Sequence, residues 1–139
     1  MEIVEYEEKY QNQIIELWQV CGLIVPWNDP VKDIKRKLAK DPELFLIGLV
    51  DDVVVASVMG GYDGHRGWVN YLAVKPELQK TGCGRQLMDA VEKKIIAQGA
   101  PKINLLIRTN NVDVIAFYKA IGYKQDEVIG MGKRLVSDE

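Results

Sequence analysis

Gln79-Lys80-Thr81-Gly82-Cys83-Gly84 forms a glycine-bearing stretch between an apolar run, Tyr71 to Val74, and a segment of helical pattern, Arg85 to Gln98. If the run is a strand and the segment a helix, the N–H groups of the first helical turn have no partners inside the helix and point toward one spot. That spot favours an anion. The two glycines suit a close approach, because a residue without a Cβ can take positive φ. On their own, they are equally compatible with a plain strand-to-helix turn.

The chain has 139 residues, of which 47% are hydrophobic and 27% charged, and we expect one domain over residues 1–139. A net charge of -2 gives no electrostatic reason to expect a nucleic-acid partner. No apolar run is long enough for a membrane span, and the acidic start does not resemble a signal peptide. Cys21, Cys83 and the single histidine, His65, lack the spacing of a metal site. We therefore expect a cytoplasmic protein without a metal and without a membrane partner.

The first third of the chain predicts one strand and two helices. Residues 3–6 alternate between apolar and charged types, as in a half-buried strand. Apolar residues then recur at helical spacing from Tyr10 to Cys21. Asp29 followed by Pro30 is typical of an N-cap and first helical position, and predicts a short second helix.

The centre of the chain predicts three strands followed by the central helix. Leu44 to Val50 and Val53 to Met59 are apolar, β-branched runs joined by two aspartates, which indicates an antiparallel hairpin. Trp68 to Val74 is the third strand. The central helix and a strand over Ile103 to Ile107 then complete a parallel, right-handed strand-helix-strand unit. After a further short helix that ends at Gly122, residues 123–135 can supply one or two more strands.

Two nucleotide-binding signatures fail at the glycine loop. A Walker phosphate loop requires Gly-x-x-x-x-Gly-Lys followed by Ser or Thr, which the chain lacks. The dinucleotide fingerprint requires a third glycine where the chain has Leu87, and an acidic residue after the next strand, where Arg108 stands.

Gln-x-x-Gly-x-Gly after a strand resembles the pyrophosphate loop of the GNAT superfamily, the acyl-CoA-dependent N-acyltransferases. The stretch from Asn111 to Tyr123 is similar to a second segment of that family, Asn-x-x-Ala-x-x-x-Tyr-x-x-x-Gly-aromatic, with Val114 in place of the usual alanine. The resemblance covers the whole chain and points to the small single-domain bacterial type. It implies an α/β (α+β) fold with a mixed, mostly antiparallel sheet of six to seven strands and about four helices. It also implies a β-bulge and a sheet splayed at the strand before the loop.

The resemblance implies acetyl-CoA as cosubstrate. Leu72, Ala73 and Val74 match the strand whose backbone pairs with the pantetheine arm. Asn111 matches a position that contacts the CoA arm, although it can equally cap the following helix. Tyr118 matches a CoA contact whose phenol protonates the departing thiolate; the alternative is a core aromatic. The residues that match the pyrophosphate loop and helix start are Gln79, Lys80, Thr81, Gly82, Cys83, Gly84 and Arg85.

The implied reaction is direct attack of a neutral amine on the thioester, through a tetrahedral intermediate held by backbone N–H groups. A base must take the amine proton, yet two positions that commonly carry a glutamate in this family are here Trp68 and Leu106. Asp63 and His65 are the candidate catalytic residues in their place, and Asp29 in the loop between the first two helices is a third candidate base. A water chain with no single base is an equal alternative.

Three residues, Trp27, Asp29 and Tyr62, are expected to bind the acceptor, a small-molecule or peptide amine. Cys83 at a helix start offers a covalent route, which we consider secondary to direct attack. The resemblance also allows a homodimer. The competing hypothesis is a non-catalytic acyl-CoA-binding sensor that kept the pocket and lost the base.

Overall fold

The computed structural model describes residues 1–139, which divide into two compact units. Residues 1–104 and 138–139 form the first unit, and residues 105–137 form the second. The single domain expected over residues 1–139 stays a prediction.

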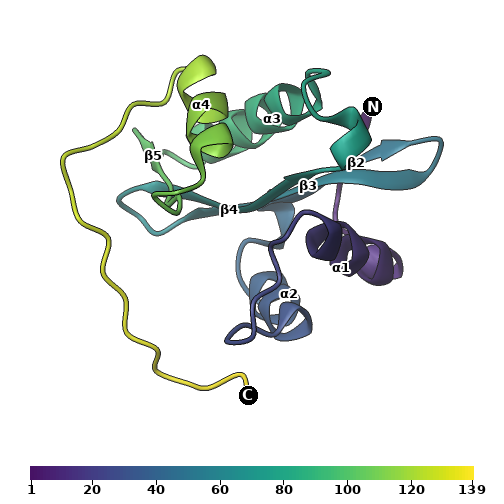
Figure 1. Cartoon of the computed structure of the whole chain (residues 1–139), viewed down its shortest axis with the longest axis horizontal. Helices are drawn as coiled ribbons and strands as arrows, with labels where there is room; N and C mark the ends of the chain where they lie inside the picture. Colours follow the sequence, from purple (N-terminus) through teal and green to yellow (C-terminus); the bar gives the residue numbers. More distant parts are fainter. The chain divides into compact units, whose positions relative to one another are not determined.

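The first unit is built on a five-stranded sheet whose strands follow one another in sequence order (Figure 1). The three pairings among the first four strands are antiparallel, and β4 pairs with β5 in parallel. The expected mixed, mostly antiparallel sheet and its parallel strand-helix-strand unit are therefore confirmed. The strands are β1 (Glu2–Glu5), β2 (Phe45–Val50), β3 (Val53–Tyr62), β4 (Gly67–Val74) and β5 (Ile103–Asn104).

The expected count of six to seven strands is wrong, for two reasons. β5 comprises two residues instead of the five expected, and residues 123–137 form no strand. In this tail Gly130 and Gly132 interrupt the apolar run, and glycine weakens a strand. Ile129 and Met131 are 88% and 93% exposed, so no buried face holds the segment as a strand.

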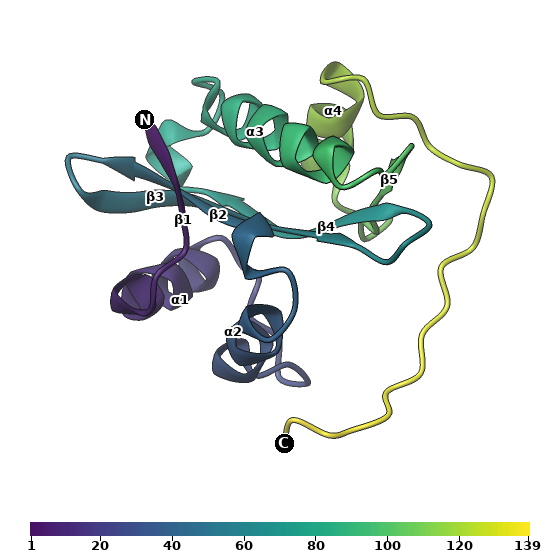
Figure 2. The same ribbon diagram turned by 180° about the vertical axis from the view of Figure 1, so that it is seen from behind.

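Three helices belong to the first unit, and they cover both faces of the sheet. These are α1 (Gln11–Val20), α2 (Pro30–Leu38) and α3 (Cys83–Ala97). α1 and α2 lie on one face and α3 on the other (Figures 1 and 2). Asp29 caps α2 as expected, because its carboxylate accepts hydrogen bonds from the N–H groups of Val31 and Lys32 at 2.9 and 3.2 Å. None of the helices of this chain combines the length and the apolar character that a membrane crossing needs.

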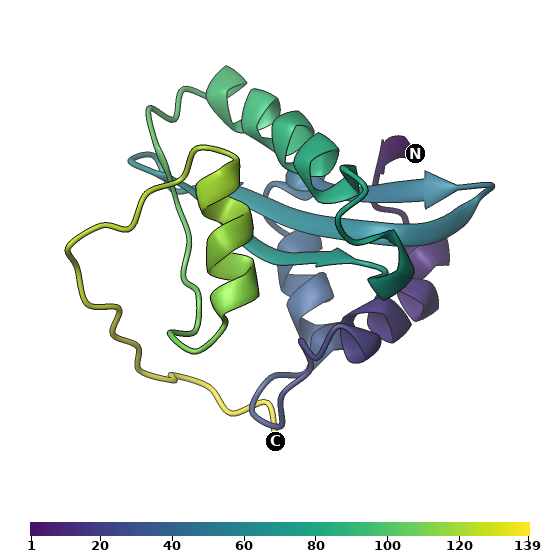
Figure 3. The ribbon, with the colours of Figure 1, turned by 45° about the horizontal axis from the view of Figure 1, so that its top comes forward.

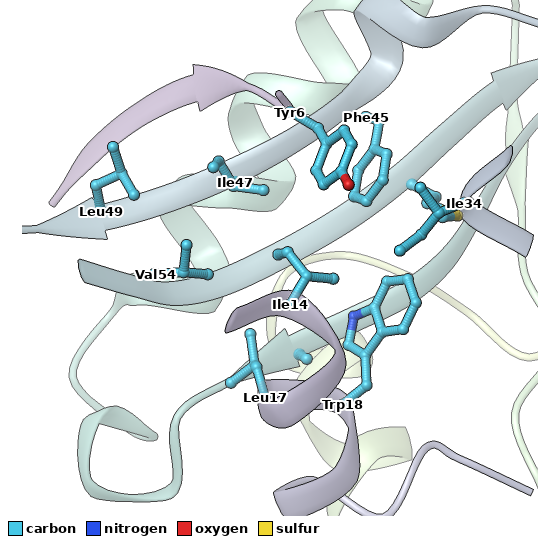
Figure 4. Close-up of a cluster of buried hydrophobic side chains, with 11 residues drawn as sticks. Tyr6, Ile14, Leu17, Trp18, Ile34, Phe45, Ile47, Leu49 and Val54 are labelled. Atoms are coloured by element: carbon cyan, nitrogen blue, oxygen red, sulfur yellow. The ribbon is translucent and has the colours of Figure 1, made fainter. Parts of the chain in front are cut away.

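The core between the sheet and α1 combines aliphatic side chains with the rings of Tyr6, Trp18 and Phe45 (Figure 4). Trp18 and Phe45 are fully buried, and the Phe45 ring stacks on Tyr6 with 4.4 Å between ring centroids. On the opposite face α3 lies along the sheet (Figure 3). Gly60 and Gly67 leave room for it. A Cβ at either glycine would come within 2.6 Å of a side chain of α3. The apolar stripe of α3 is Leu87, Met88, Val91 and Ile95, all fully buried.

The second unit contains the fourth helix, α4 (Val112–Ala120). Tyr118 is buried and meets the rings of Phe117 and Tyr123 edge-on, each at 5.2 Å between centroids. Gly122 follows with a φ of +102°, as expected for a residue that ends a helix.

Candidate active site

The strand β4 carries a β-bulge at the residues expected to meet the cosubstrate. Ser57 of β3 pairs with Ala73 and Met59 pairs with Asn70, so Tyr71 and Leu72 together face Val58 alone. Tyr71 has a φ of +51°, which is rare for a residue with a side chain. Such a bulge disrupts the regular ladder and leaves one residue outside it.

Side chains from the core hold the bulge in place. The Trp18 indole Nε1–H donates to the Ser57 hydroxyl at 2.8 Å, and this hydroxyl donates to the Tyr71 carbonyl at 2.9 Å. The Trp18 and Tyr71 rings stack with their centroids 3.9 Å apart. Ser57 is the buried polar residue of the core, with no exposed surface. Backbone strain of this kind costs about 1 to 3 kcal/mol, so it persists only where surrounding contacts impose it.

One edge of β4 is open within the first unit. β4 pairs with β5 only at Gly67 and Trp68, whose partners are Ile103 and Asn104. Beyond these two residues, Val69, Asn70, Ala73 and Val74 pair with β3 alone. Leu72, Ala73 and Val74 thus lie on an edge where an extended ligand can add as a strand. The pairing stops where β5 ends at Asn104, and the expected splay of the sheet stays a prediction.

The loop after β4 leads into the N-terminus of α3. Lys80 and Gly82 both take positive φ, +63° and +93°. Gly82 occupies the N-cap position, and no side chain caps the helix there. The first-turn N–H groups therefore lack the capping oxygen that most helices have, and the helix dipole favours an anion beside them. Nothing lies within 4 Å of the position that a Cβ of Gly82 would take, so the space over the loop is open.

The polar side chains of this loop fasten it to the strand end. The Gln79 amide donates to the Val74 carbonyl at 3.0 Å, and the Cys21 thiol donates to the same carbonyl at 3.3 Å. The Thr81 hydroxyl donates to the Leu78 carbonyl and lies 3.4 Å from the Cys83 sulfur. A pantetheine arm that paired with the Val74 carbonyl would share it with Gln79. Among the other loop residues expected to hold CoA, Gly84 is buried, whereas Lys80 and Arg85 are exposed.

A pocket of about 520 Å³ lies between α2 and the strands β3 and β4 of the first unit. Tyr62, Asp63 and Trp68 line it, and Tyr62 was the acceptor residue expected there. Trp27 and Asp29 are not among its lining residues, although Asn28 between them is. The structure thus brings one of the three expected acceptor residues into this pocket.

Asp63 shapes the loop that leads into β4. Its carboxylate accepts hydrogen bonds from the N–H groups of His65 and Arg66 at 2.8 and 2.7 Å, and from the Trp68 indole at 3.0 Å. These donors lower the pKa of Asp63 to about 2, which makes it a weak base at neutral pH. His65 is exposed and does not line the pocket. The base roles of both residues stay predictions.

Four pocket residues that sequence analysis missed come from α2 and the turn that follows it. They are Asp33, Arg36, Lys37 and Lys40. Asp33 accepts a hydrogen bond from the Tyr71 hydroxyl at 2.6 Å and pairs with Arg36 at 3.2 Å. Burial and this carboxylate raise the pKa of Tyr71 well above its ordinary value. The spacing i, i+3, i+4 places Asp33, Arg36 and Lys37 on one helix face, but a row of charged residues at this spacing is equally typical of a solvated face.

Asn111 and Tyr118 belong to the second unit, and their roles toward CoA stay predictions. Asn111 is exposed and makes no side-chain capping bond to α4. Leu106 is 76% exposed and offers no proton acceptor, while the Trp68 indole is a hydrogen-bond donor.

Residues 9–123 match the model of the Acetyltransferase (GNAT) family. The chain belongs to this family. An acetyltransferase of Yersinia enterocolitica is 46% identical over 139 residues, which cover 100% of this chain and 99% of that relative. The resemblance drawn from the glycine loop and from the Asn111 to Tyr123 segment is thereby confirmed.

Solved structures agree with this assignment. Ard1 from Thermoplasma volcanium has a TM-score of 0.78 and 25% identity to this GNAT protein, over 87% of this chain and 80% of Ard1. AAC(6')-Iy, solved in complex with the bisubstrate analogue CoA-S-monomethyl-acetylneamine, has a TM-score of 0.79 over 96% of this chain and 97% of its own. At 16% identity this second likeness shows the fold alone.

Proposed function

We propose that this protein transfers the acetyl group of acetyl-CoA to a primary amine by direct attack through a tetrahedral intermediate. The observation that carries the proposal is the continuous path from the bulged, open edge of β4 to the uncapped N-terminus of α3. Membership of an acetyltransferase family supports the same chemistry. The path offers backbone groups to an extended arm and a positive helix end to its phosphates.

In the proposed complex the pyrophosphate lies over the loop from Gln79 to Arg85, and the pantetheine arm runs along Leu72 to Val74. The amine nitrogen attacks the thioester carbon, and a backbone N–H near Leu72 stabilises the oxyanion. The carbon–sulfur bond then breaks. Tyr118 gives its proton to the departing thiolate, with Asn111 holding the CoA arm.

The acceptor amine enters the pocket beside Tyr62 and Trp68. Since the pKa of Asp63 is about 2 and Trp68 offers no base, we propose that water in the pocket takes the amine proton. The acceptor is a small molecule or a peptide. The cytoplasmic location and the homodimer stay predictions.

The first test is the melting temperature of the purified protein with and without acetyl-CoA. Ligand at a hundred times its Kd stabilises the folded state by about 2.7 kcal/mol, which should raise the melting temperature by about 5 to 10 degrees. Gly82→Val should abolish the rise, because the new side chain enters the open space over the loop and strains the positive φ. Gly132→Val, at an exposed glycine in the tail, is the matched control. No rise in the unmodified protein would contradict the proposal.

A second candidate function is an acyl-CoA-binding sensor without turnover. The observation that favours it is that neither Asp63 nor Trp68 can act as an effective base near neutral pH. Release of CoA thiol over a panel of amines separates the two functions. A sensor would give the thermal shift with no release above the rate of spontaneous hydrolysis.

A further inference from the structure

The pocket contains two lysines that form no ion pair, Lys37 and Lys40. The third cation of the pocket, Arg36, is already neutralised. Its guanidinium donates to both carboxylate oxygens of Asp138 at 2.7 and 3.3 Å and pairs with Asp33 at 3.2 Å. The free positive charge of the pocket therefore lies at the C-terminal end of α2.

Lys37 is half-buried in the pocket wall, where its ammonium group donates to the Gly60 carbonyl. Its Nζ lies 3.6 Å from the position that a Cβ of Gly61 would take, so it rests against the backbone of β3. Burial lowers the pKa of Lys37, and the carboxylates of Asp41 and Glu43 offset this only in part. A partly desolvated cation without a bound carboxylate is stabilised by any anion that reaches it.

Two of the three pocket carboxylates are occupied by donors of the protein itself. Asp33 accepts from Tyr71 and Arg36, and Asp63 accepts from two backbone N–H groups and an indole. Asp41 is the third. A ligand would thus find two ammonium groups in the pocket, those of Lys37 and Lys40, and ammonium donors bind carboxylate or phosphate oxygens.

We propose that the acceptor is an amine that also carries an anionic group, a carboxylate or a phosphate, and that Lys37 binds this group with the help of Lys40. The inference rests on the proposed acetyl transfer and names its substrate class. A polycation, such as a polyamine, brings no anion for these lysines and is repelled by them. Anchoring the anion at the end of α2 leaves the amine of the same molecule free to reach β4.

The test compares kcat/KM for matched acceptors that differ only in the anion. One pair is an amino acid and its amide, and the other is ethanolamine phosphate and ethanolamine, with spermidine as the polycation. The anionic member of at least one pair should be preferred by about tenfold or more, equivalent to about 1.4 kcal/mol. The pair that shows the preference identifies the anion as carboxylate or phosphate.

Substitutions of Lys37 test whether this residue causes the preference for anionic acceptors. Lys37→Met should reduce the anion preference by about tenfold while the neutral amine keeps its kcat/KM within about twofold, and Lys37→Arg should retain most of it. Lys35→Met is the matched control, because Lys35 is exposed on α2 and does not line the pocket. The thermal shift with acetyl-CoA should be unchanged in all three. A preference for the neutral amines or spermidine, or one that survives Lys37→Met, would overturn the inference.

A second readout does not depend on turnover. Lysine labelling with acetic anhydride, followed by mass spectrometry, should show Lys37 protected by ethanolamine phosphate or the amino acid, but not by ethanolamine, with Lys35 unaffected. Unchanged Lys37 labelling with both anionic amines overturns the inference even if another amine is acetylated. Protection of Lys37 without CoA release from any acceptor supports the anion site and counts against the proposed acetyl transfer.

Discussion

Replacing Ser57 by alanine is the sharpest test of how the core shapes the β4 bulge. The Ser57 hydroxyl has no exposed surface, accepts a hydrogen bond from the Trp18 indole and donates one to the Tyr71 carbonyl. The substitution removes a single oxygen and leaves the Trp18–Tyr71 ring stack in place. It therefore isolates two hydrogen bonds.

The expected loss of stability follows from the groups left without partners. A buried polar group that loses its partner costs about 1 to 3 kcal/mol, and Ser57→Ala affects one donor and one acceptor. We expect the free energy of unfolding to fall by about 2 to 4 kcal/mol, a large part of the 5 to 15 kcal/mol typical of a domain. Because the bulge loses its anchor, the affinity for acetyl-CoA should also fall in the folded protein.

Urea unfolding of a double-mutant cycle measures this coupling. Trp18→Phe removes the indole donor, so in the double variant with Ser57→Ala no buried N–H remains unpaired. We expect the two changes to be non-additive by about 1 to 2 kcal/mol. Thr109→Ala, at an exposed loop position, should change stability by less than about 0.5 kcal/mol. A cost of Ser57→Ala no larger than that of this control, or additive changes in the cycle, would refute the reasoning.

Three further predictions concern single residues. Gly82→Ala should lower the free energy of unfolding by roughly 1 to 2 kcal/mol, because an L residue is strained at a φ of +93°. Urea unfolding tests this with Gly132→Ala as the control, and equal losses in the two variants would contradict it. The raised pKa of Tyr71 stabilises the fold below about pH 10, and this contribution is lost as the pH rises through the higher folded-state pKa. Tyr71→Phe should therefore remove the fall in the free energy of unfolding at alkaline pH, which unfolding curves between neutral and alkaline pH will measure. Asp63 stabilises the fold above its ordinary pKa and loses this effect as the pH falls toward about 2. Because a carboxylate with so low a pKa is a weak base, Asp63→Asn should leave the acid limb of the profile of kcat/KM against pH unchanged. A shifted limb would identify Asp63 as the base.

The sequence predicted the helix starts and turns whose geometry is set by neighbouring residues. Asp29 and Pro30 marked the start of α2 because a carboxylate cap and a fixed φ act within one turn. Asp51 and Asp52 marked the hairpin, and both take the positive φ that a two-residue turn of this kind requires. The glycine loop likewise predicted a helix start, because Gly82 at the N-cap of α3 takes a positive φ that glycine adopts readily.

The features that sequence analysis missed depend on contacts between distant residues. The family resemblance implied a β-bulge, but no local signal places it at Tyr71, because its positive φ is imposed by Ser57 and Trp18, which are 14 and 53 positions away. The strand count was wrong because an apolar pattern forms a strand only where a surface buries it, and Val128, Ile129 and Met131 of the tail are exposed. The α2 face of the pocket was overlooked because Asp33 to Lys40 resemble any solvated helix face until β3 and β4 are placed opposite.

Tyr71 joins the two halves of the proposed reaction. Its backbone forms the bulge on the cosubstrate edge, while its hydroxyl holds Asp33 in the acceptor pocket at 2.6 Å. Because one residue has both contacts, a change that moves its ring should affect acetyl-CoA affinity and acceptor KM together. Tyr71→Phe keeps the ring stacked on Trp18 and removes only the bond to Asp33, so it should raise the acceptor KM while the Kd for acetyl-CoA stays within about twofold. Tyr71→Ala should weaken both, and an effect of Tyr71→Ala on one ligand alone would show that the bulge and the pocket are independent.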